Sequence, residues 1–520
     1  MEELKILITT SGVGSRLGDI TNYTNKSLVR IGTKPSLSHI IDMYPEDIPI
    51  VITLGYYGSH VRDYLTLAYP DRDISFVTVD KYKGPGTSLA YSILQTREEL
   101  QCPFIFHACD TIIRENVPIY DDCNWLAGSN LENSSQYRTL MVEDGKVIKI
   151  NEKGSLSFDH SYIGLCKIKD YECFWDELQK LDFSDSSLSD CHVINNMIKN
   201  RGCEFDICQT SQWIDIGNSQ ALKKARKLIT SEYDVLDKLD ESIFFLGTNV
   251  VKFFHDDNIC RDRVHRAKNL DGLVPEISDS KDNFYIYPLK EGTLFSKTAN
   301  RKNFTKFLNW AKEDLWHPTE IDSNEFRGIC KKFYFDKTVG RVNRYLELMD
   351  HSDDACYING ELVPPALTMI DELDFDWLSD GTPVKFHGDF ILDNIIEFDS
   401  KFCLIDWRQD FGGSLESGDI YYDLAKLNHN LTLNHDIIKK GMFTVENRGD
   451  NISCEIMCSS RLMKCQEIFH KFIVDNNLDL RKVKVLTSLV WINMSPLHEY
   501  PFNKFLFNFG KYNLFCNLGD

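Results

Sequence analysis

The chain has 520 residues, of which 42% are hydrophobic and 26% charged, and its formal net charge at pH 7 is −20. This length predicts two or three domains, and the composition is that of an ordinary globular protein. The acidic balance argues against nucleic acid or an anionic membrane as a partner, because both are bound by clustered Lys and Arg.

Sixteen cysteines are spread along the chain without a Cys-x-x-Cys pair, so the sequence predicts neither a zinc site nor a disulfide framework. No uninterrupted apolar run approaches the ~18 residues of a membrane-spanning helix, and the first residues lack the pattern of a secretory signal. We therefore expect a reduced, cytoplasmic protein without membrane insertion.

The first predicted element is a buried strand at residues 4–9, followed at once by a loop that contains Gly12, Gly14 and Ser15. Glycines let the backbone approach a phosphate chain and direct its amide groups toward it. Arg16 adds a planar positive fork. The loop is a candidate nucleotide-binding site, although a Gly-x-Gly alone also fits any tight turn.

Two further loops continue this pattern. Lys26 supplies a second cation in the Asn-Lys-Ser-Leu segment 25–28. Gly86 and Thr87 lie in a Lys-Gly-Pro-Gly-Thr-Ser loop just before a predicted helix. A threonine at that point can cap the helix, and the same loop can also contact a ligand.

Two aspartates follow apolar strands. Asp110 comes shortly after the predicted strand 104–108, and Asp215 ends the Trp-Ile-Asp segment 213–215. Open α/β sheets bind ligands at the carboxyl ends of their strands. A single Asp there is often only a turn or a cap, but a pair can hold the magnesium that nucleotidyl transfer requires.

Together these segments resemble the sugar-phosphate nucleotidylyltransferases over roughly residues 1–230. The resemblance implies a Rossmann-like, GT-A-like α/β domain in which Arg16 and Lys26 are catalytic. It also implies that Asp110 and Asp215 bind Mg²⁺. The residues that it implies for nucleotide binding are Gly12, Gly14, Ser15, Gly86 and Thr87.

The same resemblance extends to the acceptor side of the site. The Val-x-x-Ile-x-Glu-Lys-like segment 147–153 implies that Glu152 contacts a sugar hydroxyl and Lys153 the acceptor phosphate. Gly164 falls in the glycine-bearing strand that follows and is also implied to line the acceptor. Without the resemblance, a Glu-Lys pair at a strand end is an ordinary solvated turn.

Two positions depart from the family pattern. Ser11 stands where Ala or Gly is usual, and Asn25 replaces the proline before the lysine. The second departure also occurs in enzymes that activate phosphocholine. The acceptor is therefore open between a sugar phosphate and a phosphorylated alcohol.

A Lys/Arg-rich helix predicted at 220–229 closes the first domain, and the polar, acidic stretch 231–240 separates it from the rest. We expect a nucleotidylyltransferase domain at 1–232. A second domain is expected at 241–520.

The second domain is organised around residues 385–406, where a His-Gly-Asp turn precedes a short hairpin. Phosphoryl transfer from ATP needs one carboxylate to orient the attacking hydroxyl, and a carboxamide with a second carboxylate to hold magnesium. Asp389 fits the first role, and Asn394 with Asp406 fits the second. The alternative is a polar hairpin with acidic turns.

This pattern is similar to the signature of the aminoglycoside phosphotransferase and choline kinase superfamily, and residues 418–425 resemble its next segment. The resemblance implies a bilobal, protein-kinase-like α+β domain. Lys252, inside an apolar strand, is implied to bind the ATP phosphates. The helix predicted at 261–270 contains no glutamate to pair with this lysine, so Asp262 and Glu276 are the candidate substitutes.

The aromatic segment 489–501 follows in the last part of the chain. We expect it to line the acceptor pocket of the kinase. Aromatic stretches more often belong to a core, which is the alternative interpretation.

Two sites on one chain predict consecutive reactions. The kinase would phosphorylate a small hydroxyl compound with ATP, foremost a sugar at its anomeric position. The nucleotidylyltransferase would then transfer an NMP unit from a second NTP, CTP or UTP, releasing pyrophosphate and giving an NDP-sugar for surface polysaccharide. Both sites would use Mg²⁺ and small-molecule substrates. The sequence leaves open whether the protein forms a homo-oligomer.

Two alternatives stand beside this hypothesis. The first is a choline, ethanolamine or polyol kinase fused to a CTP:phospho-alcohol cytidylyltransferase, which would make a CDP-linked head group. The second is a non-catalytic pseudokinase that senses nucleotide. The missing helix glutamate is the support for the second alternative.

Overall fold

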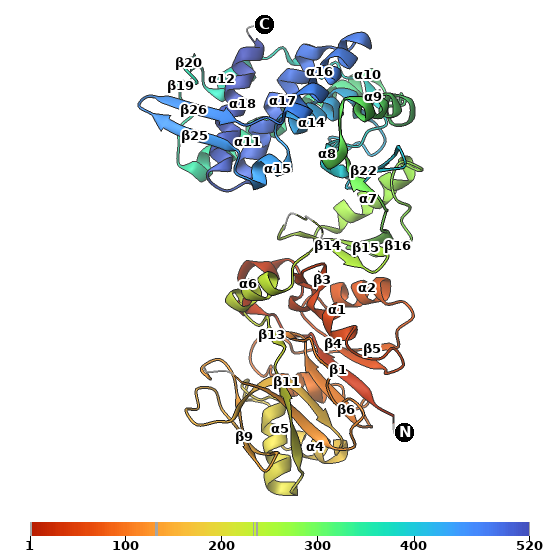
Figure 1. Ribbon diagram of the computed structural model, residues 1–520, viewed down its shortest axis with the longest axis vertical. Coiled ribbons are helices and arrows are strands. Elements are labelled where there is room, and N and C mark those ends of the chain that lie inside the picture. Colours follow the sequence, from red (N-terminus) through yellow and green to blue (C-terminus); the bar gives the residue numbers. More distant parts are fainter. Residues whose placement is uncertain (1–2, 131–133, 232, 234, 236–237, 519–520) are drawn as a thin grey trace. The chain divides into compact units, whose positions relative to one another are not determined.

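The computed structural model describes residues 3–518 except 131–133, 232, 234 and 236–237. It is a mixture of helices and sheets, as the sequence predicts (Figure 1). The chain forms two compact units. The first contains Met1–Asp257 and Ser278–Tyr287, and the second contains Asn258–Ile277 and Pro288–Asp520.

This division differs in position from the boundary placed on the sequence between residues 232 and 241. The segments 241–257 and 278–287 cluster with the first unit. Residue 232 itself lies outside the described residues. The functional assignment of 1–232 and 241–520 stays a prediction.

A nine-stranded sheet forms the centre of the first unit, in the order β5-β4-β1-β6-β11-β8-β12-β10-β9. The four strands from β5 to β6 are parallel, and β11 runs antiparallel to both of its neighbours β6 and β8. The strands are β1 (Lys5–Thr9), β4 (Ile50–Leu54), β5 (Ile74–Thr78), β6 (Phe104–Ala108), β8 (Asn124–Ser129), β9 (Thr139–Glu143), β10 (Lys146–Asn151), β11 (His160–Ile168) and β12 (Phe205–Thr210).

Both faces of this sheet are buried, which explains why β1 is apolar at successive positions. Ile6 and Ile8 face one core with α1 and α2, whereas Leu7 faces a second core with α3, α4 and α5. The helices of the unit are α1 (Ser36–Ile41), α2 (Gly58–Ala68), α3 (Leu89–Leu94), α4 (Tyr171–Leu178), α5 (Asp190–Asn196) and α6 (Ser219–Leu228).

Short elements follow the carboxyl ends of the parallel strands, and Asp110 and Asp215 lie next to or within them. Their small strands are β2 (Arg30–Ile31), β3 (Lys34–Pro35), β7 (Thr111–Ile113) and β13 (Trp213–Asp215). Strand β13 pairs antiparallel with β7, with Asp215 opposite Thr111. This pairing brings the end of the domain back to the turn that follows β6.

A four-stranded sheet, ordered β14-β15-β17-β16, also belongs to the first unit. Its strands are β14 (Glu241–Leu246), β15 (Asn249–Phe254), β16 (Asp279–Ser280) and β17 (Phe284–Pro288). It packs on α2, where the rings of Tyr64 and Phe244 lie 5.4 Å apart and those of His60 and Phe253 5.1 Å apart. The strands expected to begin the kinase therefore share a hydrophobic core with α1 and α2.

The second unit is mainly helical, with α17 and α18 packed along each other (Figure 1). Its helices are α7 (Asp257–Asn269), α8 (Phe295–Thr298), α9 (Arg301–Trp310), α10 (Ser323–Lys331), α11 (Lys337–Met349), α12 (Ala366–Asp371), α13 (Phe375–Ser379), α14 (Ile420–Thr432), α15 (His435–Lys439), α16 (Ser460–Asp475), α17 (Leu480–Met494) and α18 (Phe502–Leu518). Among the described residues, no helix combines the length and apolar character that crossing a bilayer demands.

Small sheets complete the second unit. Strand β22 pairs with both β18 and β23, β26 pairs with both β19 and β25, and β21 pairs with β24. The strands are β18 (Thr293–Leu294), β19 (Cys356–Ile358), β20 (Glu361–Val363), β21 (Pro383–Val384), β22 (Ile395–Phe398), β23 (Lys401–Leu404), β24 (Gly418–Asp419), β25 (Phe443–Arg448) and β26 (Asn451–Ile456). The β22–β23 hairpin is the one that the sequence predicts after Asp389.

Phe253→Ala tests the packing between the four-stranded sheet and α2. Phe253 is 2% exposed, so its truncation leaves a cavity and lowers the free energy of unfolding by about 3–5 kcal/mol. Phe398→Ala is the control, because this ring is 50% exposed. Urea denaturation measures both variants, and a loss below about 1 kcal/mol for Phe253→Ala would contradict the packing.

Candidate active sites

The glycine-rich loop after β1 leads into Arg16 and packs against Lys26 of the segment 25–28. Gly14 has φ of 72°, and a Cβ on it would lie 2.8 Å from the Cβ of Lys26. Only glycine accommodates both the left-handed backbone and this close approach. Ser15 begins the 3-10 turn Ser15–Asn22, which carries Arg16, and the space beside Gly12 is open.

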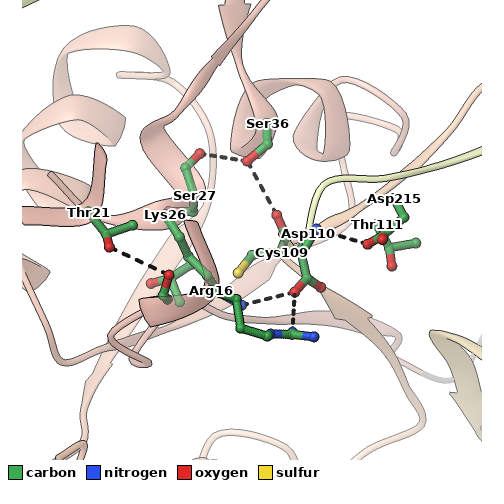
Figure 2. Close-up of polar contacts among 12 residues, drawn as sticks. Arg16, Thr21, Lys26, Ser27, Ser36, Cys109, Asp110, Thr111 and Asp215 are labelled. Carbon is green, nitrogen blue, oxygen red and sulfur yellow. Dashed lines mark hydrogen bonds and ion pairs between the residues drawn. The ribbon is translucent and has the colours of Figure 1, made fainter. Parts of the chain in front are cut away.

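Asp110 lies in the turn between β6 and β7, and both cations point toward its carboxylate (Figure 2). Lys26 Nζ is 3.2 Å and Arg16 Nη2 is 3.9 Å from Asp110 Oδ2. Burial acts to raise the pKa of Asp110, but Lys26 and Arg16 lower it overall. The carboxylate is therefore ionised at neutral pH.

Asp215 joins this group from the end of β13. A Cβ placed on Gly217 would lie 3.1 Å from Asp215 Oδ1, 3.4 Å from Arg16 Nη2 and 3.4 Å from Asp110 Oδ2. Three charged groups that are far apart in sequence thus surround one point. Burial, together with the charge of Asp110, raises the pKa of Asp215.

Tyr137 is a contact that the sequence analysis missed. Its hydroxyl donates a 2.8 Å hydrogen bond to Asp215 Oδ2. Burial and this bond raise the pKa of Tyr137, so the phenol stays protonated and orients the carboxylate. Tyr137 lies in an irregular loop without a motif, so the sequence carries no signal for this role.

Asn25, the departure from the usual proline, holds the Lys26 loop by its side chain. Its Nδ2 donates to the carbonyls of Thr10 at 2.8 Å and Tyr56 at 2.6 Å, and its Oδ1 accepts from Ser27 N and Oγ. Asn25 is fully buried. These hydrogen bonds restrain the loop in place of the rigid ring of proline.

Ser36, at the start of α1, joins the two loops that carry charge. Its Oγ lies 2.9 Å from the carbonyl of Ser27 and 3.3 Å from that of Cys109 (Figure 2). The residues before Asp110 and after Lys26 are therefore tied to the same helix end.

The acceptor residues expected near this group occupy an exposed strand end. Glu152 forms an ion pair with Arg138 at 3.1 Å and lies 3.5 Å from His192 Nε2. Burial and the charges of Arg16 and Arg138 lower the pKa of Lys153. Lys153 is thus close enough to Arg16 and Arg138 to be affected by their positive charges. The partner of Glu152 is Arg138, a residue that the sequence did not single out.

The remaining residues predicted for this site are Gly164, Gly86 and Thr87. Gly164 has φ of 77°, and a Cβ there would lie 2.9 Å from the Cβ of Ala108, so glycine permits β11 to pass close to the end of β6. Thr87 Oγ1 donates to the carbonyl of Gly84 at 2.7 Å. Among the described residues, neither Gly86 nor Thr87 hydrogen-bonds to the aspartate cluster, so their nucleotide role stays a prediction.

The donor chemistry of Asp110 and Asp215 fits magnesium. Mg²⁺ prefers oxygen ligands and is commonly bound by one or two carboxylates together with substrate phosphates. Within the described residues, no group of three or more His, Cys, Asp or Glu side chains is arranged to hold a metal ion by itself. A metal here would accordingly share its coordination with the nucleotide.

In the second unit, Asp389 and Asn394 lie together at the start of the β22–β23 hairpin. Asn394 Nδ2 donates to Asp389 Oδ2 and to the Asp389 carbonyl, each at 3.0 Å. Lys426 of α14, which the sequence analysis missed, lies 2.7 Å from Asp389 Oδ1. Burial acts to raise the pKa of Asp389, but Lys426 lowers it to about 2.

Buried polar groups hold the turn that carries Asp389. Asp423 accepts hydrogen bonds from His387 N at 2.8 Å and Gly388 N at 2.7 Å, and burial raises its pKa to about 6. Arg266, which is 1% exposed, donates to the carbonyls of His387, Phe386 and Arg408. Helices α7 and α14, which are far apart in the sequence, therefore both form hydrogen bonds with the same turn.

Asp406, the second expected metal ligand, forms a 2.6 Å ion pair with Arg263 Nη1 of α7. The backbone links it to Asn394, because Ile405 N donates to the Asn394 carbonyl at 2.9 Å. An amide and a carboxylate suit magnesium. Helix α7, which lacks the expected glutamate, thus provides Arg263 as an ion-pair partner of Asp406.

Lys252 lies on β15 in the first unit and is 7% exposed. It pairs with Ile243 across β14 and β15. Its expected contact with ATP phosphates stays a prediction, as does the protein-kinase-like fold of the second unit.

No family model matches the chain. "Bifunctional protein GlmU" of Methanococcus maripaludis is 25% identical over 150 residues, which are 28% of this chain and 35% of the relative. "Probable glucose-1-phosphate cytidylyltransferase" of Bacillus subtilis is 27% identical over 177 residues, 29% of this chain and 70% of the relative.

"Choline-phosphate cytidylyltransferase" of Streptococcus pneumoniae is 31% identical over 107 residues, covering 20% of this chain and 44% of the relative. The chain spans about a third of the length of the GlmU relatives that it matches. These similarities show an N-terminal nucleotidylyltransferase-like region.

Solved structures match with low scores. The CTP:phosphocholine cytidylyltransferase of Streptococcus pneumoniae has a TM-score of 0.39 and 20% identity over 44% of this chain and 100% of its own. A glucose-1-phosphate thymidylyltransferase from Bacillus anthracis, described as putative in its name, has a TM-score of 0.39 and 18% identity over 45% of this chain and 98% of its own.

Asn25→Ala tests the hydrogen bonds that hold the Lys26 loop. The substitution leaves the buried carbonyl of Thr10 and the partly buried carbonyl of Tyr56 without this donor, so the free energy of unfolding falls by about 1–3 kcal/mol. Asn22→Ala, at an exposed position of the preceding turn, is the control and changes it by less than about 0.5 kcal/mol. Equal stabilities of the two variants in urea would show that Asn25 does not restrain the loop.

Proposed function

We propose that the first unit transfers a nucleotidyl group to a phosphorylated small molecule. The observation that carries this proposal is the convergence of Arg16, Lys26, Asp110 and Asp215 at one point of a nucleotidylyltransferase-like region. Two cations and two carboxylates at the carboxyl ends of parallel strands suit a triphosphate and its metal.

The chemistry assigns a part to each side chain. A phosphate oxygen of the acceptor attacks the α-phosphorus of an NTP, and the bond to the bridging oxygen of pyrophosphate breaks. Arg16 and Lys26 stabilise the charge that develops on the phosphate oxygens. Asp110 and Asp215 would hold Mg²⁺, which supplies charge neutralisation at the triphosphate. Lys153 would hold the acceptor phosphate.

We also propose that the second unit makes that acceptor phosphate with ATP. The supporting observation is that Asp389, Asn394 and Asp406 are held at one hairpin by α7 and α14. Asp389, ionised beside Lys426, would orient the attacking hydroxyl and take its proton, while Asn394 and Asp406 would hold Mg²⁺.

The product would be an NDP-sugar for surface polysaccharide, made from a sugar phosphorylated at its anomeric position. Support comes from the similarity to a glucose-1-phosphate cytidylyltransferase. The second candidate is a CDP-linked head group made from choline, ethanolamine or another alcohol. It is favoured by Asn25 and by the similarity to a choline-phosphate cytidylyltransferase.

An activity panel separates the candidates. Purified protein is given ATP and Mg²⁺ with free sugars, polyols, choline or ethanolamine, and ADP is measured. CTP, UTP, GTP or dTTP is then added, and pyrophosphate is measured. A sugar that gives both products supports the NDP-sugar proposal, and turnover of only choline or ethanolamine with CTP overturns it.

Asp110→Asn removes a carboxylate from the first site. We expect pyrophosphate release from a pre-phosphorylated acceptor to fall on the order of 100-fold or more, because the site loses a ligand of the Mg²⁺ that would neutralise charge on the triphosphate. ADP formation at the second site is unchanged. Asp71→Asn, at an exposed position of the same unit, is the control, and equal pyrophosphate release by both variants would contradict the role of Asp110.

Asp389→Asn tests the second site. ADP formation that depends on the acceptor should fall by about 10²–10⁴, the usual contribution of a general base. Pyrophosphate release from a pre-phosphorylated acceptor should persist. Asp399→Asn is the control, because Asp399 is exposed and its left-handed φ of 49° also suits asparagine. Full product formation from the unphosphorylated acceptor by Asp389→Asn would favour the pseudokinase alternative.

A further inference from the structure

The second unit contains a cavity of about 150 Å³ that adjoins Asp389. Lys426 belongs to its wall and lies 2.7 Å from the Asp389 carboxylate. One side is apolar and is formed by α17, with Leu486, Leu489 and Val490. The segment 489–501, expected to line an acceptor pocket, therefore contributes to a cavity beside the proposed base.

The other side of the cavity is positively charged. Lys337 and Arg341 come from α11, Arg408 from the segment after β23, and Lys426 from α14. In the part of the chain that the structure describes, no carboxylate lies within 4.0 Å of the charged nitrogens of Lys337, Arg341 or Arg408. Only Lys426 has such a partner, and that partner is Asp389.

The local environment of these cations favours a ligand with negative charge. Arg341 Nη1 is buried and has no hydrogen-bond partner in the protein. Burial and the charges of Arg408, Lys426 and Arg341 hold the pKa of Lys337 well below its usual range, with Asp410 acting in the opposite direction. An unpaired buried charge is costly, and an anion that enters the cavity would relieve this cost.

The aromatic rings of the cavity do not form a site for a quaternary ammonium group. Such a site needs exposed ring faces, often with an acidic group nearby. Lys337 Nζ lies 4.1 Å from the centre of the Phe333 ring and 5.8 Å from that of Tyr422, and the Arg408 guanidinium lies 5.2 Å from that of Phe333. Protein cations therefore already take the positions that choline would use.

We propose that the acceptor phosphorylated in the second unit is itself an anion, a small hydroxyl compound that carries a carboxylate, phosphonate or phosphate group. This proposal rests on the kinase function proposed above. The anionic group would bind Lys337, Arg341 and Arg408 through charge-assisted hydrogen bonds. The hydroxyl oxygen would attack the γ-phosphorus of ATP, its proton would pass to Asp389 and then to water, and ADP would leave with the bridging oxygen.

The test uses matched pairs that differ in charge: glucuronate and glucose, galacturonate and galactose, glycerate and glycerol, 2-hydroxyethylphosphonate and ethylene glycol, with choline added. Acceptor binding is measured by calorimetry, and ADP formation is measured with ATP and Mg²⁺. In at least one pair the anion should show at least about tenfold tighter binding and higher kcat/KM. Which anion is turned over distinguishes carboxylates from phosphonates.

Arg341→Gln supplies the matched variant. It should weaken binding of the preferred anion by about tenfold or more, with a corresponding rise in KM, and leave the neutral member of the pair unaffected. Arg344→Gln is the control, because Arg344 is exposed on the same helix. If thermal denaturation shows that Arg341→Gln does not fold, Lys337→Gln replaces it.

The outcomes separate this proposal from the kinase function. ADP formation with choline or neutral acceptors alone, insensitive to Arg341→Gln, would overturn the anionic acceptor and keep the kinase. Anion binding that Arg341→Gln abolishes, without any ADP formation, would support the anionic site and overturn the kinase. Absence of both binding and turnover for every anion tested would count against the anionic acceptor.

Discussion

Loops that carry charged groups need buried hydrogen bonds to hold them, because they lie outside helices and sheets and their backbone groups must still be satisfied. Asn25 meets this constraint in the first unit, where it donates to Thr10 and Tyr56 and accepts from Ser27. Arg266 and Asp423 meet it in the second unit, around the turn that carries Asp389. Loss of any of these groups would leave backbone amides or carbonyls of the loop without these hydrogen-bond partners.

The two candidate sites share one electrostatic feature. Each places carboxylates beside a lysine: Asp110 beside Lys26 in one unit and Asp389 beside Lys426 in the other. The lysine lowers the pKa of its neighbour and keeps it ionised despite partial burial. Ionised oxygens are then available to hold a metal or to accept a proton.

The cavity beside Asp389 changes the chemical expectations for the acceptor. Its cations come from α11, α14 and the segment after β23, and in the described part of the chain three of them have no carboxylate within 4.0 Å. A sugar acid phosphorylated at its anomeric hydroxyl would satisfy both this charge and the proposed NDP-sugar product. In the proposed order of reactions, phosphorylation comes first. Its product would be the phosphorylated acceptor for the reaction that involves Arg16 and Lys153.

The sequence by itself determined the residues of the main motifs and most of the strands that carry them. Apolar runs followed by Asp110, or by the His-Gly-Asp turn, are local patterns, and local patterns specify strands, turns and their end residues. The β22–β23 hairpin and the strand before Asp110 were predictable for this reason. The role of the helix that lacks the family's glutamate was not predictable, because its Arg263 pairs with Asp406, which is far away in the sequence.

Only the tertiary structure decided which distant residues meet. Tyr137 reaches Asp215, Lys426 reaches Asp389, and α11 brings Lys337 and Arg341 to one cavity. It also decided that β14, β15 and β17 pack with α1 and α2 in the first unit. Periodicity reports which face of an element is buried, but the partner of that face depends on packing between segments far apart in the chain, which no local pattern encodes.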